Sequence, residues 1–153
     1  MMGCGKSTVG NLLAKALNLP FIETDAKIEQ TYGKIPLLFE KGEGYFRALE
    51  TEIIKSVCAA DGVISTGGGV VTVKENIPLL KRNATVIYLD LDGETLFSRC
   101  QNTDRPLAKD KRLFLELLKN RDELYRSCAD VVVDTRGRSA EQVACEILKT
   151  LKK

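Results

Sequence analysis

The chain has 153 residues, of which 44% are hydrophobic and 29% charged, enough for one domain with its own apolar core. Its 23 Lys and Arg residues against 21 Asp and Glu leave a net charge of +2, too small to predict a nucleic-acid or membrane partner. The sequence contains no histidine, which excludes Ser-His-Asp and Cys-His catalysis and HExxH zinc sites.

The five cysteines are odd in number and form no CxxC pair, so they predict reduced thiols rather than a disulfide framework. No signal-peptide pattern is present, and no apolar run approaches the length of a membrane span. We therefore expect a cytoplasmic protein whose partners are small molecules.

The first predicted element is an anion-binding loop with the sequence GCGKST at positions 3–8. Small residues let backbone N–H groups converge on a phosphate, Lys6 can reach the outer phosphates, and the Ser7 hydroxyl can bind Mg²⁺. Apolar residues at helical spacing follow from Val9 to Leu17, so the loop opens a helix. The upstream glycine and hydrophobic strand of a full P-loop are absent, and a chance match is the alternative.

Short apolar runs then alternate with helical patterns along the chain. Strands are predicted at 19–22, 63–65, 86–89 and 131–133, and helices at 43–60, 74–82, 93–100, 112–128 and 139–151. This alternation predicts an α/β fold, with helices on both faces of a central parallel β-sheet. Residues 1–153 are expected to form a single domain, in which 26–60 is a helical substrate-binding segment.

The polar, basic stretch 101–112 interrupts this series without any apolar period. It is either a plain surface loop or, beside a phosphate-binding loop, a lid that closes over the ligand.

Two strand ends carry residues suited to chemistry. Glu23 and Asp25 follow the first predicted strand, at the sheet edge where α/β folds bind ligands. Asp25 could accept a proton from a substrate hydroxyl, or it could merely cap the helix that follows. Three successive glycines, 67–69, follow the strand at 63–65, and they predict a backbone that something must approach closely.

Two arginines complete the candidate site. Arg121 lies on the apolar stripe of the helix at 112–128, and an inward guanidinium needs an anionic partner. Arg47 lies beside the apolar stripe of its own helix, where a solvated arginine is the ordinary alternative. Two arginines meeting in one crevice would suit a substrate carboxylate.

Together these residues resemble the shikimate kinase family along essentially the whole chain. The resembling segments occur in the family's order and near its spacing: GCGKST at 3–8, FIETD at 21–25, GEGYFRALE at 42–50, TGGG at 66–69, RPL at 105–107 and RDELY at 121–125. The resemblance implies a P-loop kinase that transfers phosphate from ATP to the 3-hydroxyl of shikimate in the chorismate pathway of aromatic amino acid biosynthesis. It also implies Mg²⁺ as cofactor, shikimate and ATP as partners, and a monomer.

Site residues follow from the same resemblance. The implied catalytic residues are Lys6, Asp25 and Arg105, where Arg105 would close with the lid over the phosphates. Binding of ATP is implied for Gly3, Cys4, Gly5, Lys6, Ser7, Thr8, Arg99, Arg105 and Arg138. Binding of shikimate is implied for Asp25, Arg47, Gly67, Gly68, Gly69 and Arg121. Binding of Mg²⁺ is implied for Ser7 and, through water, Glu23.

The chain departs from the family's pattern at two places. Glu23 stands where the family usually has aspartate, and an outer-sphere role for Mg²⁺ should survive the extra methylene. The strand that should precede the loop is missing from the middle of the sheet, between the strands that end at Ser65 and Leu89. We therefore expect a late-assigned start or a shortened chain, and a badly destabilised fold.

Two other functions compete with this assignment. A different small-molecule kinase of the same architecture, such as a gluconate kinase, is the nearest. The other is a nucleotide-binding module that has lost catalysis, which the missing strand and Glu23 both favour.

Overall fold

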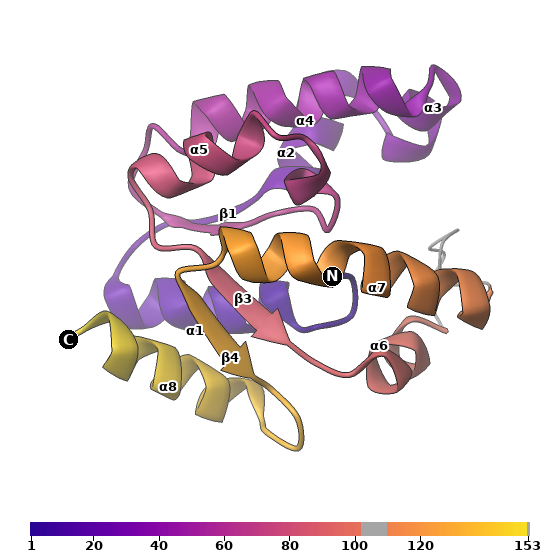
Figure 1. The fold of residues 1–153 in the computed structure, drawn as a ribbon. Helices are drawn as coiled ribbons and strands as arrows, with labels where there is room; N and C mark the ends of the chain where they lie inside the picture. Colours follow the sequence, from indigo (N-terminus) through magenta and orange to yellow (C-terminus); the bar gives the residue numbers. More distant parts are fainter. Residues whose placement is uncertain (102–109, 153) are drawn as a thin grey trace.

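The computed structural model describes residues 1–101 and 110–152, so Arg105 and most of the expected lid lie outside the described residues. Helices and strands alternate along the chain as expected (Figure 1). In chain order the elements are α1 (Lys6–Leu17), β1 (Phe21–Glu23), α2 (Thr24–Tyr32), α3 (Ile35–Glu40), α4 (Glu43–Val57), β2 (Val63–Ser65), η1 (Val70–Thr72), α5 (Asn76–Arg82), β3 (Ile87–Asp90), α6 (Gly93–Cys100), α7 (Lys111–Cys128), β4 (Val131–Asp134) and α8 (Ala140–Leu151).

Several boundaries differ from the predicted ones for local reasons. The first strand begins at Phe21 rather than at position 19, because Pro20 has no N–H and contributes only its carbonyl, which accepts from Val63 N–H at 2.9 Å. The helix predicted to reach position 60 ends at Val57. Lys111 and Arg112 lie in the first turn of α7, so the end of the polar stretch 101–112 is helical, and Asp110 caps it through a bond from Leu113 N–H.

All described strand pairs are parallel, as predicted, but they form two separate pairs rather than one continuous sheet. β1 pairs with β2 in the register Phe21↔Val63 to Glu23↔Ser65. β3 pairs with β4 in the register Ile87↔Val131 to Asp90↔Asp134. The polar strand ends in each pair therefore lie at one edge, which is where the site is built.

A cavity of about 420 Å³ separates the two pairs. The segments 62–68 of the β2 region and 83–89 of the β3 region both line it, together with side chains of α1, η1, α5, α7 and α8. The sequence predicted a missing strand at this place, and the described residues put no strand there.

The helices are divided between two apolar clusters. A small cluster packs α2, α3 and α4 together around Ile28, Leu38, Phe46, Leu49, Ile53 and Val57. The larger cluster joins α1 and α8 to the β3–β4 pair and α7 (Figure 1). The small cluster fixes α2 against α4, and these two helices carry Asp25 and Arg47. Within the described residues, no helix is both long and apolar enough to cross a membrane.

The cavity predicts low stability for residues 1–153. Among the described residues, the apolar side chains that line this half-open cavity lack the packing partners that a strand between the two pairs would supply. Whole domains are stable by only ~5–15 kcal/mol, so the loss of these contacts is a large fraction of the total. We expect a thermal midpoint below about 45 °C, or a broad transition, by circular dichroism and calorimetry. A single cooperative transition above that temperature would contradict this prediction.

Candidate active site

The loop at 3–8 has the backbone of an anion-binding turn. Gly3 and Gly5 both have positive φ, 78° and 89°, and Gly5 is the N-cap of α1. A Cβ on Gly3 would lie 2.8 Å from Cys100 Sγ and 3.1 Å from the Leu96 carbonyl oxygen, so a larger residue would collide with α6. Helix α1 therefore starts at Lys6 with its N-terminal amides directed toward the loop, as predicted.

Positive charge is concentrated at this loop. Lys6 Nζ donates to the Met1 carbonyl at 2.7 Å and lies 3.7 Å from Cys4 Sγ. Burial and the neighbouring Lys6 lower the pKa of the Met1 α-ammonium to about 6. Burial opposes ionisation of the Cys4 thiol, but Lys6 and the Met1 ammonium outweigh it and lower the Cys4 pKa. The Lys6 ammonium and the N-terminal amides of α1 therefore favour an anionic ligand at this loop.

Ser7 and Glu23 meet beside the loop. The Ser7 hydroxyl donates to Glu23 Oε1, which joins the first turn of α1 to the end of β1. A hydroxyl and a carboxylate oxygen side by side fit Mg²⁺, which takes few protein ligands and keeps waters and phosphate oxygens. Among residues 1–101 and 110–152, no group of three or more His, Cys, Asp or Glu side chains could hold a metal ion.

The triple glycine allows charged side chains to pack directly on the backbone. A Cβ on Gly67 would lie 2.8 Å from Asp25 Oδ1 and 2.9 Å from Glu50 Oε1. A Cβ on Gly69 would lie 2.2 Å from Arg47 Nη2, which is an impossible contact. The expected close approach to this backbone is therefore present, and Asp25, Glu50 and Arg47 make it.

Asp25 is not the N-cap of the helix that follows, which was the alternative role for this residue; it lies in the first turn of that helix. Helix α2 starts one residue earlier, at Thr24, and its N-cap, Glu23, makes no side-chain capping bond. The buried Thr24 hydroxyl instead accepts the N–H of Gly67 at 3.2 Å. This bond ties the start of α2 to the glycine loop and holds Asp25 beside Gly67.

Arg47 is largely buried rather than solvated. Its side chain is 14% exposed, and Nη1 lies 2.7 Å from Oε2 of Glu50, whose side chain is 1% exposed. The same guanidinium reaches the exposed Glu43 at 3.2 Å. The ring of Phe46 lies 5.2 Å from Arg47 Cζ and adds a cation–π contact.

Glu50 was not predicted as a site residue. Burial raises its pKa, Arg47 opposes that shift, and the carboxylate of Asp25 adds to it. Its Oε1 atom is buried without a hydrogen-bond partner in the described residues. A glutamate three residues after an arginine is common on exposed helices, so the sequence held no signal that this pair would be buried.

Arg121 faces inward, as the apolar stripe predicted. It is 9% exposed. Its positive charge acts to lower the pKa of Glu50 and that of Tyr125, which lies one turn further along α7. Burial raises the pKa of Tyr125, and Arg121 opposes that shift. The Tyr125 hydroxyl donates to the Gly68 carbonyl at 2.5 Å, so α7 is bonded to the middle of the triple glycine.

The remaining candidates lie around the loops. Arg99 is exposed on α6, and its Cβ is 3.7 Å from the position of a Cβ on Gly3, beside the phosphate-binding loop. Arg138 donates to the Asp134 carbonyl at 2.9 Å and pairs with Glu146 of α8. Thr8 is exposed in the first turn of α1. The structure therefore brings together Asp25, Arg47, Gly67, Gly68, Gly69 and Arg121. Ser7 of the phosphate loop meets Glu23, and Cys4 and Lys6 of the same loop line one cavity with Gly67 and Gly68.

The chain is similar to known proteins of one family over nearly its whole length. A sequence model of the shikimate kinase family matches residues 2–152. A curated shikimate kinase from Persephonella marina is 45% identical over 152 residues, which cover 96% of this chain and 92% of the relative. The structure of shikimate kinase from Acinetobacter baumannii in complex with shikimate superposes with a TM-score of 0.93 at 35% identity, covering 99% of this chain and 88% of that one. Shikimate kinase from Aquifex aeolicus superposes with a TM-score of 0.82 at 37% identity, covering 99% of this chain and 92% of that one. The chain belongs to the shikimate kinase family.

Proposed function

We propose that this protein transfers the terminal phosphate of ATP to the 3-hydroxyl of shikimate and releases shikimate 3-phosphate and ADP. Family membership supports the reaction type. The observation that carries the substrate assignment is the meeting of Arg47, Arg121 and Asp25 around the triple glycine. Two guanidinium groups suit a carboxylate, and an adjacent carboxylate suits a hydroxyl.

Each group has a defined task in this proposal. Arg47 and Arg121 bind the substrate carboxylate and thereby orient the ring. Asp25 accepts the proton of the attacking hydroxyl, or orients it, as the bond to phosphorus forms. Lys6 exchanges its bond to the Met1 carbonyl for the outer phosphates of ATP. Gly67, Gly68 and Gly69 line the substrate side of the pocket.

The cofactor and the remaining assignments follow from family membership. Mg²⁺ bound near Ser7 and Glu23 would neutralise phosphate charge during transfer. Arg99 and Arg138 are assigned to the nucleotide, and Arg105, outside the described residues, to the phosphates. Five free cysteines support a cytoplasmic location, and we expect a monomer.

The direct test is ADP release by the chain with ATP and Mg²⁺, measured at 20 °C with and without shikimate. We expect ADP release to depend on shikimate and to be abolished in Lys6→Ala. Release that depends on gluconate instead would support the rival kinase. Binding of shikimate without turnover would support a module that has lost catalysis.

Replacing either clamp arginine with lysine should weaken shikimate binding specifically. Arg47→Lys and Arg121→Lys lose bidentate, charge-assisted hydrogen bonds worth about 1.5–3 kcal/mol, so KM for shikimate should rise about tenfold or more. KM for ATP should stay within about twofold. The matched control is Arg82→Lys at the exposed end of α5, which should match the parent. Unchanged KM for shikimate in both site variants would refute the clamp.

Nucleotide binding should also protect Cys4 from alkylation. When ATP takes Lys6, the thiol loses the charge that lowers its pKa, so its pKa rises and the thiolate fraction falls. Peptide-resolved mass spectrometry should show several-fold slower labelling of Cys4 with ATP and Mg²⁺. Labelling of the exposed Cys145 should not change and serves as the internal control. Equal Cys4 rates with and without nucleotide would contradict this.

A further inference from the structure

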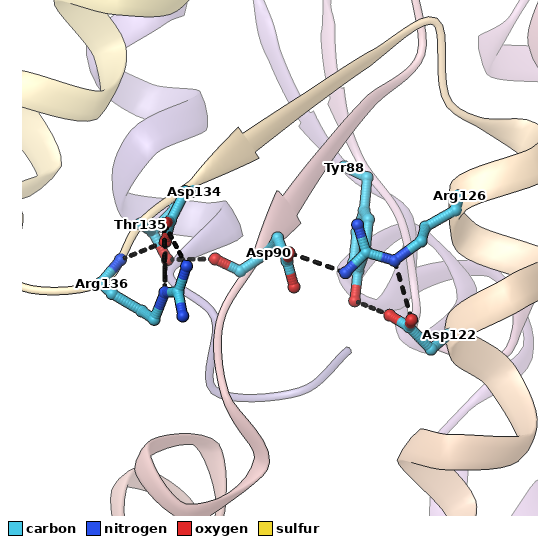
Figure 2. Close-up of polar contacts among 7 residues, drawn as sticks. All are labelled: Tyr88, Asp90, Asp122, Arg126, Asp134, Thr135 and Arg136. Carbon is cyan, nitrogen blue, oxygen red and sulfur yellow. Dashed lines mark hydrogen bonds and ion pairs between the residues drawn. The ribbon is translucent and has the colours of Figure 1, made fainter.

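One polar cluster of the described residues has no part in the mechanism above. It lies where α7 crosses the end of β3 and contains Tyr88, Asp90, Asp122 and Arg126 (Figure 2). The Tyr88 hydroxyl donates to Asp122 Oδ1 at 3.0 Å. Arg126 bridges Asp122 Oδ2 at 2.8 Å and Asp90 Oδ2 at 2.7 Å.

The cluster contacts the turn of α7 that follows Arg121 and holds that turn against β3. Tyr88 contacts this turn twice, through its hydroxyl on Asp122 and through its ring, whose centroid lies 5.1 Å from that of Tyr125. The guanidinium carbon of Arg126 lies 5.6 Å from the centroid of the Tyr88 ring. Contacts at positions 122, 125 and 126 resist both rotation and sliding of the helix, so they set the direction in which Arg121 points.

The other end of the cluster is attached to the sheet. The Asp90 carbonyl accepts from both the N–H and the hydroxyl of Thr135, each at 2.9 Å, while its carboxylate holds Arg126 (Figure 2). A single residue thus ties α7 to both β3 and β4. The nearby pair of Arg136 and Asp134 is exposed and is separate from α7.

Simple stabilisation does not account for the placement of these groups. Tyr88 is only 7% exposed, and an apolar residue there would pack without requiring a partner. Burial and the bond to Asp122 raise the pKa of Tyr88. Its hydroxyl donates to the Asp122 carboxylate. The bonds also lie on the turn that places Arg121 and bonds Gly68, rather than near the start of α7.

We propose that Tyr88, together with Asp122, positions Arg121 and the glycine loop for the substrate carboxylate without touching the substrate. This inference rests on the proposed function. Tyr88 and Asp122 are positioning residues, and Arg126 contributes less because its side chain is half-exposed and its ion pairs are screened by water. Loss of the contact between Tyr88 and Asp122 should therefore weaken the binding of shikimate and leave the nucleotide site unchanged.

Tyr88→Phe is the cleanest variant, because it removes the hydroxyl and leaves the ring stack, and Asp122 keeps Arg126 as a partner. We expect KM for shikimate to rise about three- to tenfold, with kcat and KM for ATP within about twofold. Asp122→Ala removes the partner of both Tyr88 and Arg126 and should raise KM further. The double variant Tyr88→Phe/Asp122→Ala should match Asp122→Ala alone, since Tyr88→Phe removes only a bond that Asp122→Ala has already removed.

Ser127→Ala is the matched control. It also deletes a hydroxyl on α7, one that donates to the Leu124 carbonyl at 3.1 Å on the exposed side of the helix. Its kinetic constants should equal those of the parent. Melting curves of every variant separate loss of folded protein from loss of affinity.

The outcomes are distinct. If Tyr88→Phe lowers the melting temperature but leaves KM for shikimate unchanged, the cluster is structural only and the inference is overturned. Equal rises in KM for both substrates would also overturn it. If the parent chain itself releases no shikimate-dependent ADP, the proposed function fails and the inference falls with it, which the parent assay shows directly.

Discussion

At Gly69 the guanidinium of Arg47 occupies the space that any side chain would need, and at Gly67 two carboxylates do the same. This contact is the constraint on which the site depends. Three helices meet at one short loop because its residues have no Cβ atoms. Helix α2 brings Asp25, α4 brings Arg47 and Glu50, and α7 bonds to Gly68 through Tyr125. The entropic cost of three glycines is offset by the number of charged groups that can converge there.

The charged side chains that meet at the glycine loop are buried, so each positive charge there needs a negative partner. Two arginines and two carboxylates surround the glycine loop, so the buried groups are close to neutral before a ligand arrives. Glu50 satisfies Arg47 in the absence of substrate, which avoids an unpaired buried guanidinium, but its second oxygen is left without a partner in the described residues. An arriving carboxylate therefore meets a guanidinium that is already held in place, and little ordering of Arg47 is needed on binding.

Local patterns were sufficient to predict the strands and most of the helices, but not the separate helices α2 and α3 or the short helix η1. Patterns only a few residues long predict the phosphate loop, the inward arginine of α7 and the strand ends, because such patterns follow the helix and strand periods. Glu50 and Tyr88 could not be predicted, because their partners lie on other elements or are buried only in the folded chain. The division of the strands into two pairs was predicted only as a missing strand between them, since pairing is a property of neighbours in space.

The contacts of Tyr88 with α7 help to hold the β3–β4 pair in place relative to the β1–β2 pair, across the cavity between β2 and β3. The segment 83–89 that lines the cavity leads directly into Asp90, and Tyr88 and Tyr125 are themselves part of the cavity wall. With no strand between the pairs in the described residues, α7 spans from β3 to the glycine loop of β2 through Tyr88, Tyr125 and Gly68. That link consists of a hydrogen bond and stacked aromatic rings, not of backbone hydrogen bonds between strands. It can therefore hold the two halves of the site in place relative to each other although the strands form two separate pairs.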